Sequence, residues 1–249
     1  MTSLLVAGNS QAGALRNAIN QPTPGGIAGV EVSFCFAAGG FGPNIQLIDG
    51  CPHVVPDSEK FPSQYFPDTA ASRPISTYDV IVISALGYVD GGYAHLNSIV
   101  AQGCPWRYDP AETAQLVSEA CWRATVRHML AGHFGSAFAR SLRAHFAGLI
   151  IVQAFPPLSE LVKAHEHWRL RAVTRDPVAL ALALRDIQQA HLEDLCRDIG
   201  ASLLSPPPEA LTADGFLKER FSKPDFIHCK PEFGQLVWDQ IRDQLHGSA

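Results

Sequence analysis

Short apolar runs alternate along the chain with longer stretches of helical periodicity. Five runs have the length and composition of strands, and they fall at residues 4–8, 30–37, 78–84, 148–153 and 202–204. The third and fourth runs are apolar at nearly every position, which is typical of strands buried on both faces of a sheet. The alternation therefore predicts an α/β fold in which helices cover a parallel sheet.

Helical periodicity and capping signals place the helices between and after these strands. Two helices are predicted to start at an Asp-Pro pair, at 109–110 and at 176–177, because aspartate caps a helix and proline suits its first position. The last helix has an amphipathic pattern. The expected helices cover residues 11–20, 110–146 with a break near 132–135, 177–199, and 233–245.

Two long stretches show neither the apolar runs of strands nor the periodicity of helices. Residues 39–74 are rich in Gly, Pro and Asp, and residues 205–232 separate the fifth predicted strand from the last helix. Loops of this length in a compact domain are commonly functional. We expect a single domain over residues 1–249, with helical or loop insertions around 41–75 and 155–176.

Composition and charge are those of a globular protein without a polyanionic partner. Of the 249 residues, 47% are hydrophobic and 17% are charged, and 19 basic against 24 acidic residues give a formal net charge of −5. The chain has no basic cluster of the kind that follows a phosphate backbone. No apolar run approaches the ~20 residues that a membrane-spanning helix needs. We therefore expect neither nucleic acid nor a membrane as a partner.

The cysteines and the start of the chain predict a cytoplasmic protein. The six cysteines form no C-x-x-C pair, so they lack metal-ligand spacing and are expected to be free thiols in a reducing compartment. The first predicted strand starts at residue 4, without the basic segment and cleavage site of a leader peptide. His128, His133 and His145 lack the i, i+4 spacing of a helical metal site. No metal or other cofactor is predicted.

The turn after the first strand carries one candidate for catalysis. Gly8 ends the strand, Ser10 follows two residues later, and small residues open the helix. Ligands of open α/β sheets bind beyond the carboxyl ends of the strands, where N–H groups at a helix start can stabilise an oxyanion. The segment lacks the Lys-Ser/Thr of a P-loop and the G-x-G-x-x-G of a dinucleotide turn. Ser10 is either a nucleophile or a helix N-cap, and this segment fits both roles.

The stretch before the last helix carries the second candidate. Asp225 precedes His228 by three residues, a spacing that lets the carboxylate reach the imidazole and fix its tautomer. Serine is a weak nucleophile without such a base. The two segments together predict Ser10 as nucleophile, His228 as its base, and Asp225 as the residue that orients the base.

These two segments resemble the first and last motifs of the SGNH, or GDSL, hydrolases. The first is Gly-Asn-Ser at 8–10, and the last is Asp-Phe-Ile-His at 225–228. The resemblance implies a three-layer flavodoxin-like sandwich, with a five-stranded parallel sheet that we expect in the order 2-1-3-4-5. It also implies a Ser-Asp-His triad and an esterase-type hydrolase that forms an acyl-enzyme on Ser10.

The resemblance further implies backbone donors for the oxyanion. Beside the N–H of Ser10, the family uses a glycine N–H after the second strand, which here is Gly39 or Gly40. A plain turn is the other interpretation of that glycine pair. The family's aspartate before the serine is Asn9 in this chain, a change that leaves the nucleophile intact.

One donor of the family pattern is missing. The block Gly-x-Asn-Asp, which follows the third strand in the family, reads Gly-Tyr-Val-Asp at 87–90, so Val89 replaces the donor asparagine. The loss of one such donor typically costs ~10²–10³ in rate. Asn44, Asn97 and the backbone N–H of Gly87 are candidate replacements, and the sequence selects none of them.

Three functions stay open at this point. The first is an ester hydrolase, with O-acyl or O-acetyl groups of a carbohydrate as candidate targets and a small-molecule or glycan ester as the expected partner. The second is an acyltransferase, which uses the same triad with an acceptor hydroxyl in place of water. The third is a non-catalytic binding module with a degenerate site, which Val89 favours and the intact triad opposes.

Overall fold

Five parallel strands form the central sheet of the computed structural model, in the order β2-β1-β5-β8-β9. Counted along the chain, this is the order 2-1-3-4-5, so the predicted sheet is confirmed. The strands are β1 (Thr2–Gly8), β2 (Val30–Phe36), β5 (Val80–Ser84), β8 (Leu149–Gln153) and β9 (Ser202–Leu204). The structure describes residues 1–9, 12–20, 27–36, 43–55, 73–84, 103–166 and 168–247.

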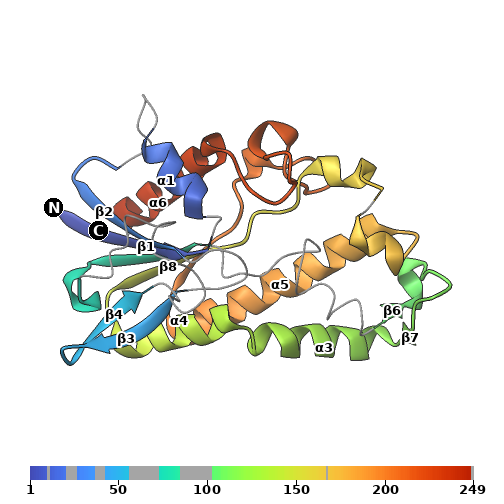
Figure 1. Ribbon diagram of the computed structural model, residues 1–249, viewed down its shortest axis with the longest axis horizontal. Helices are drawn as coiled ribbons and strands as arrows, with labels where there is room; N and C mark the ends of the chain where they lie inside the picture. Colours follow the sequence, from blue (N-terminus) through green and yellow to red (C-terminus); the bar gives the residue numbers. More distant parts are fainter. Residues whose placement is uncertain are drawn as a thin grey trace.

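Helices cover both faces of the sheet and complete the predicted three-layer α/β sandwich (Figure 1). Along β1, Leu4 and Val6 pack in the core under α1 and α6, whereas Leu5 and Ala7 pack in the core under the other helices. One face carries α1 (Ala12–Ile19) and α6 (Pro231–Gly247), and the other carries α3 (Glu119–Ala131), α4 (Phe134–His145) and α5 (Pro177–Ile199). Short 3-10 helices occur at Ile75–Thr77, Trp106–Tyr108, Glu160–Ala164, Arg169–Ala172, Pro208–Ala210 and Glu219–Phe221.

Long-range contacts override one predicted helix start. Asp109 does not start an α-helix; with a left-handed backbone (φ 47°) it caps the end of the 3-10 helix Trp106–Tyr108, and residues 109–111 hydrogen-bond to residues 173–175. The helix begins instead at α3, where the side chain of Ser118 accepts the N–H of Cys121 at 3.2 Å. The start predicted at 109–110 is therefore wrong. The predicted break near 132–135 is confirmed, because α3 ends and α4 begins there.

A β-hairpin lies inside the stretch that the sequence analysis left irregular. Residues 39–74 contain β3 (Asn44–Ile48) and β4 (Cys51–Val55), which pair antiparallel. Asp49 and Gly50 form the turn, with φ of 52° and 78°. Two left-handed residues in a row are what a type I′ hairpin turn needs, and Asp-Gly is a strong sequence signal for it. The short strands β6 (Cys104–Pro105) and β7 (Leu116–Val117) form a further small sheet.

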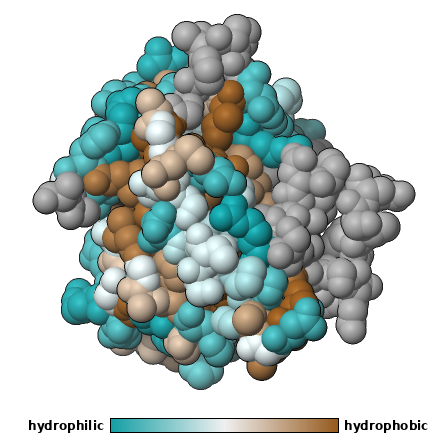
Figure 2. All heavy atoms as spheres, turned by 90° about the vertical axis from the view of Figure 1, so that its left-hand side faces the viewer, coloured by the Kyte–Doolittle hydropathy of each residue, from teal (hydrophilic) through white to brown (hydrophobic). Residues whose placement is uncertain are grey.

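The molecular surface near the start of β1 mixes hydrophobic and hydrophilic residues over the part not drawn in grey (Figure 2). Within the described residues, none of the helices combines the length and the apolar character required to cross a membrane.

The two helices on one face of the sheet pack closely against each other. The buried side chain of Trp238 in α6 donates its indole N–H to the carbonyl oxygen of Leu15 in α1, at 2.9 Å. A Cβ on Gly234 would lie only 2.2 Å from the carbonyl oxygen of Ala14, so this crossing requires glycine. Since α6 begins soon after residues 225–228, the contact brings that segment toward the start of α1.

We expect Gly234→Ala to destabilise the fold by about 1–3 kcal/mol, because the added methyl group forces the backbones of α1 and α6 apart. Urea unfolding at equilibrium measures the change. Gly132→Ala is the matched control, since a Cβ there would meet nothing closer than 3.6 Å. Equal stability of the two variants would show that the helix contact is not tight.

Candidate active site

Two residues of the predicted triad are described, and they contact each other directly. Nδ1 of His228 lies 2.9 Å from Oδ2 of Asp225. The other carboxylate oxygen, Oδ1, accepts the backbone N–H groups of Ile227 at 3.0 Å and of His228 at 2.8 Å. Phe226 between them has a left-handed backbone with φ 66°, which turns the chain back on itself. Both oxygens of the carboxylate are thus used to fix the histidine.

The other predicted site residues fall mostly outside the part of the chain that the structure describes. Ser10 and the glycines proposed as oxyanion donors lie outside it, as do Val89 and Asn97, so their roles stay predictions. Asn44 is described, and it is exposed at the start of β3, where it pairs with Val55. The predicted site residues outside the described part of the chain are therefore Ser10, Gly39, Gly40, Gly87, Val89 and Asn97.

The described residues on either side of Ser10 locate the carboxyl edge of the sheet. Gly8 is the last residue of β1, and Asn9 after it is buried. The N–H of Ala12, the first residue of α1, donates to the carbonyl oxygen of Asn9 at 3.0 Å. This edge is where ligands bind in open α/β sheets.

Hydrogen bonds keep the carboxylate of the pair ionised. Partial burial alone would raise the pKa of Asp225, but the hydrogen bonds from His228 and from the N–H of Ile227 outweigh it, and the pKa lies below its ordinary value. A carboxylate at Nδ1 holds the ring proton there, so Nε2 of His228 is the basic nitrogen. The pair has the arrangement of a general base and its orienting residue.

The lowered pKa of Asp225 makes a prediction about stability and pH. The ionised carboxylate stabilises the folded state above the unfolded pKa of about 3.9, and this contribution is lost as the pH falls through the lower folded pKa. We expect Asp225→Asn to be less stable than the wild type at neutral pH, with the difference narrowing toward about pH 3. Urea unfolding at both pH values tests this; a difference independent of pH would contradict it.

The segment after β8 holds the 225–228 loop in place. The N–H of Ser159 donates to the carbonyl oxygen of Phe226 at 3.0 Å. The buried hydroxyl of Ser159 accepts from Ser222 at 2.8 Å and from the N–H of Leu161 at 3.3 Å. The rings of Phe226 and His165 meet edge to face, with centroids 4.9 Å apart. The left-handed residue of the loop is therefore fixed through both its backbone and its side chain.

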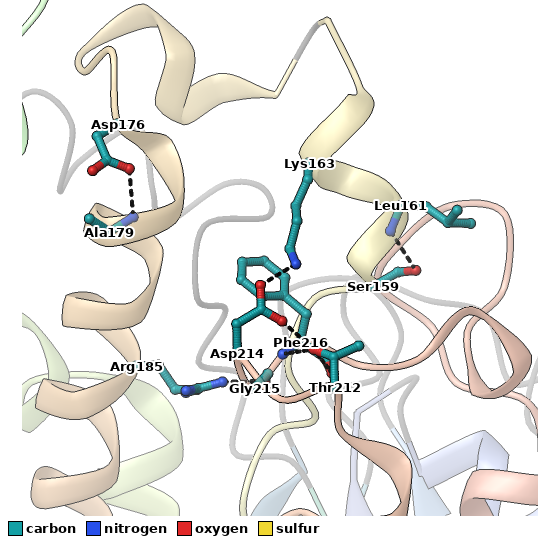
Figure 3. A network of polar contacts seen from close by, with 10 residues as sticks. All are labelled: Ser159, Leu161, Lys163, Asp176, Ala179, Arg185, Thr212, Asp214, Gly215 and Phe216. Carbon is teal, nitrogen blue, oxygen red and sulfur yellow. Dashed lines mark hydrogen bonds and ion pairs between the residues drawn. The ribbon is translucent and has the colours of Figure 1, made fainter.

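A second set of polar contacts joins this region to α5 (Figure 3). Lys163 forms an ion pair with Asp214, whose other oxygen accepts the hydroxyl of Thr212 at 2.6 Å. Arg185 of α5 donates to the carbonyl oxygen of Gly215. The segment after β8, the loop around residue 214 and α5 are thereby connected. The predicted start of α5 is confirmed in the same view, where Asp176 caps the helix.

Sequence reasoning missed a buried polar pair at the carboxyl edge of the sheet. The hydroxyl of Ser84, at the end of β5, donates to Oε1 of Gln153, at the end of β8, at 2.6 Å. Their exposed fractions are 0% and 4%. The available signal was that each strand, Val-Ile-Val-Ile-Ser and Leu-Ile-Ile-Val-Gln, is apolar until a polar last residue.

The described residues show no metal-binding cluster. Among them, no three His, Cys, Asp or Glu side chains come together in a way that could hold a metal ion.

Comparisons with known proteins find similarity only at the level of structure. No family model and no curated protein matches the chain. A GDSL-like lipase from Bacteroides thetaiotaomicron is 12% identical, with 100% of this chain and 89% of that chain covered and a TM-score of 0.46. Est24, a carbohydrate acetylesterase from Sinorhizobium meliloti, is also 12% identical, with 100% of each chain covered and a TM-score of 0.45.

A third similar structure is an acetyl xylan esterase from Butyrivibrio proteoclasticus. It is 10% identical, with 99% of this chain and 64% of that chain covered and a TM-score of 0.43. At these TM-scores the likeness assigns no function, which has to come from the residues of this chain.

Proposed function

We propose that the protein is a serine esterase-type hydrolase in which Ser10, His228 and Asp225 form the catalytic triad. The observation that carries the proposal is the hydrogen-bonded pair of Asp225 and His228 in the loop before α6. Because α6 packs on α1, this loop and the start of α1 belong to the same end of the fold. Ser10 stands two residues before Ala12, the first residue of α1, in the sequence.

The proposed reaction has two steps. In the first, Ser10 attacks the ester carbonyl while Nε2 of His228 takes the hydroxyl proton, which it then gives to the leaving alcohol. In the second, His228 takes a proton from water and the resulting nucleophile attacks the acyl-enzyme. His228 then gives this proton to Oγ of Ser10 as the carboxylic acid is released. Asp225 stabilises the imidazolium in both steps. The N–H of Ser10 and of Gly39 or Gly40 are the proposed oxyanion donors.

The proposed substrate is a small-molecule or glycan ester. We place O-acetyl groups of carbohydrates first among the substrates, on the resemblance to the family alone. An acyltransferase would share the triad and the acyl-enzyme, and it would differ only in the group that accepts the acyl chain. The products distinguish these two functions.

Product analysis with a p-nitrophenyl acetate substrate and a peracetylated monosaccharide tests the proposal. A hydrolase releases free acetate from either ester at a rate that depends on Ser10. Transfer of the acetyl group to an added alcohol in preference to water would favour the acyltransferase. Rates no faster than the uncatalysed reaction with both esters, for the wild type as for Ser10→Ala, would leave the binding module as the better interpretation.

A further inference from the structure

The last residues of three neighbouring strands form a row at the carboxyl edge of the sheet. Gly8 of β1 pairs with Ser84 of β5, which pairs with Gln153 of β8. Side chains alternate along a strand, and Val82 and Ile151, two residues before Ser84 and Gln153, belong to the core under α1 and α6. Ser84 and Gln153 therefore lie on the sheet face that α1 covers.

The side-chain amide of Gln153 is held through its oxygen. Its oxygen accepts the Ser84 hydroxyl at 2.6 Å, which places the amide group over the end of β5 although its backbone is in β8. The residue is 4% exposed, and its contact with Ser84 is made through the amide oxygen, so this hydrogen bond uses neither N–H of the amide nitrogen. An amide nitrogen carries two N–H donors, so this nitrogen is suited to bind an acceptor oxygen at the carboxyl edge of the sheet.

The position of this amide matches the donor that the family pattern lacks here. A Cβ on Gly8 would come within 3.2 Å of Cβ of Ser84, so the pair borders the strand end from which the chain continues to Ser10. The family's asparagine follows the same strand as Ser84, and Val89 occupies its place. Gln153 reaches that strand end from the neighbouring strand.

We propose that Nε2 of Gln153 donates a hydrogen bond to the carbonyl oxygen of the substrate ester as negative charge develops on it. The proposal rests on the function proposed above and assigns it a further catalytic residue. Ser84 acts as a positioning residue, since its hydroxyl binds the amide oxygen and leaves the nitrogen as the end of the amide that can donate to the substrate. No proton is transferred to or from either side chain.

Kinetics of Gln153→Ala and Gln153→Glu test the proposal. Removing one oxyanion donor lowers kcat by ~10²–10³, and we expect this loss for both variants with KM changed only a few-fold. Affinity for a boronic acid inhibitor, which forms a tetrahedral adduct with a nucleophilic serine, should fall by the same factor. Gln188→Ala removes another buried amide, in α5, and should leave kcat unchanged.

A double variant separates catalysis from folding. Ser84→Ala with Gln153→Met removes both polar partners and keeps the volume of the glutamine, so it should fold and melt like the wild type. We expect it to lose kcat and inhibitor affinity as Gln153→Ala does. A double variant that folds and keeps kcat within three-fold of the wild type overturns the inference.

The inference and the proposed function fail in different ways. If Ser10→Ala is inactive while the Gln153 variants keep full kcat, Gln153 is not a donor and the esterase proposal stands. If Ser10→Ala keeps the wild-type rate, the proposed function is wrong and the role of Gln153 falls with it. A loss of kcat in Gln153→Ala that Gln188→Ala shares would also contradict the inference, because it would reflect packing.

Discussion

We expect replacement of Ser10 or His228 by alanine to abolish turnover of an activated short-chain ester. Each change removes one half of a unit, the nucleophile or its base, and in a comparable triad either loss costs on the order of 10⁶ in kcat. The double variant should be scarcely slower than either single variant, because the second change removes a group that no longer acts. Steady-state kinetics with p-nitrophenyl acetate measure all three rates.

The same chain offers a matched control for these variants. Ser136 and His191 also form a serine–histidine contact, with Oγ and Nε2 2.9 Å apart. The hydroxyl of Ser136 donates to the carbonyl oxygen of Leu130 at 2.8 Å, so its proton is committed to the backbone. Ser136→Ala should leave kcat unchanged. A loss of activity in this variant equal to that of Ser10→Ala would contradict the assignment of the nucleophile.

Stability should separate catalysis from folding in the triad variants. The side chain of His228 is 36% exposed and belongs to a loop, so His228→Ala removes little packing. We expect its thermal midpoint within a few degrees of the wild type, measured by circular dichroism. A variant that loses activity only because it unfolds would show a much lower midpoint.

We expect Asp225→Asn to lower kcat by roughly 10⁴ and to leave more activity than the loss of Ser10 or His228. The asparagine oxygen can still accept the two backbone N–H groups that Oδ1 accepts now. Its NH₂ group takes the place of Oδ2 and cannot accept the Nδ1 proton, so the imidazole adopts the other tautomer. The base is then present with its proton on the wrong nitrogen.

The same assay measures kcat of this variant. Asp225→Ala, which removes both functions of the carboxylate, should be no faster than Asp225→Asn. Wild-type kcat in Asp225→Asn would show that the contact between Asp225 and His228 supports the loop and not the reaction.

Local sequence patterns were sufficient to predict the sheet and the contact within the 225–228 loop. The strands could be predicted because the apolar runs that end at Ser84 and Gln153 are buried on both faces. The contact between Asp225 and His228 could be predicted because it joins residues three apart. The turn between β3 and β4 also has a local signal, the Asp-Gly pair at 49–50, which the sequence analysis did not use.

Contacts between distant residues could not be predicted from local patterns. The helix-start signal at Asp109 failed because this part of the chain hydrogen-bonds to a distant segment. The hydroxyl of Thr174, 65 residues further along the chain, donates to the carbonyl oxygen of Asp109. Ser84 and Gln153 are 69 residues apart, and only the register of β5 and β8 brings them together. Propensity and spacing carry no information on such pairs.

Covalent labelling of Ser10 tests the central claim most directly. The native protein is incubated with a fluorophosphonate, digested, and analysed by mass spectrometry of its peptides. We expect one adduct, on the peptide that contains Ser10, with labelling strongly slowed in His228→Ala and absent in Ser10→Ala. An adduct that persists in Ser10→Ala would contradict the proposal that Ser10 is an activated nucleophile. So would a native protein that stays unlabelled under conditions in which it hydrolyses the model ester.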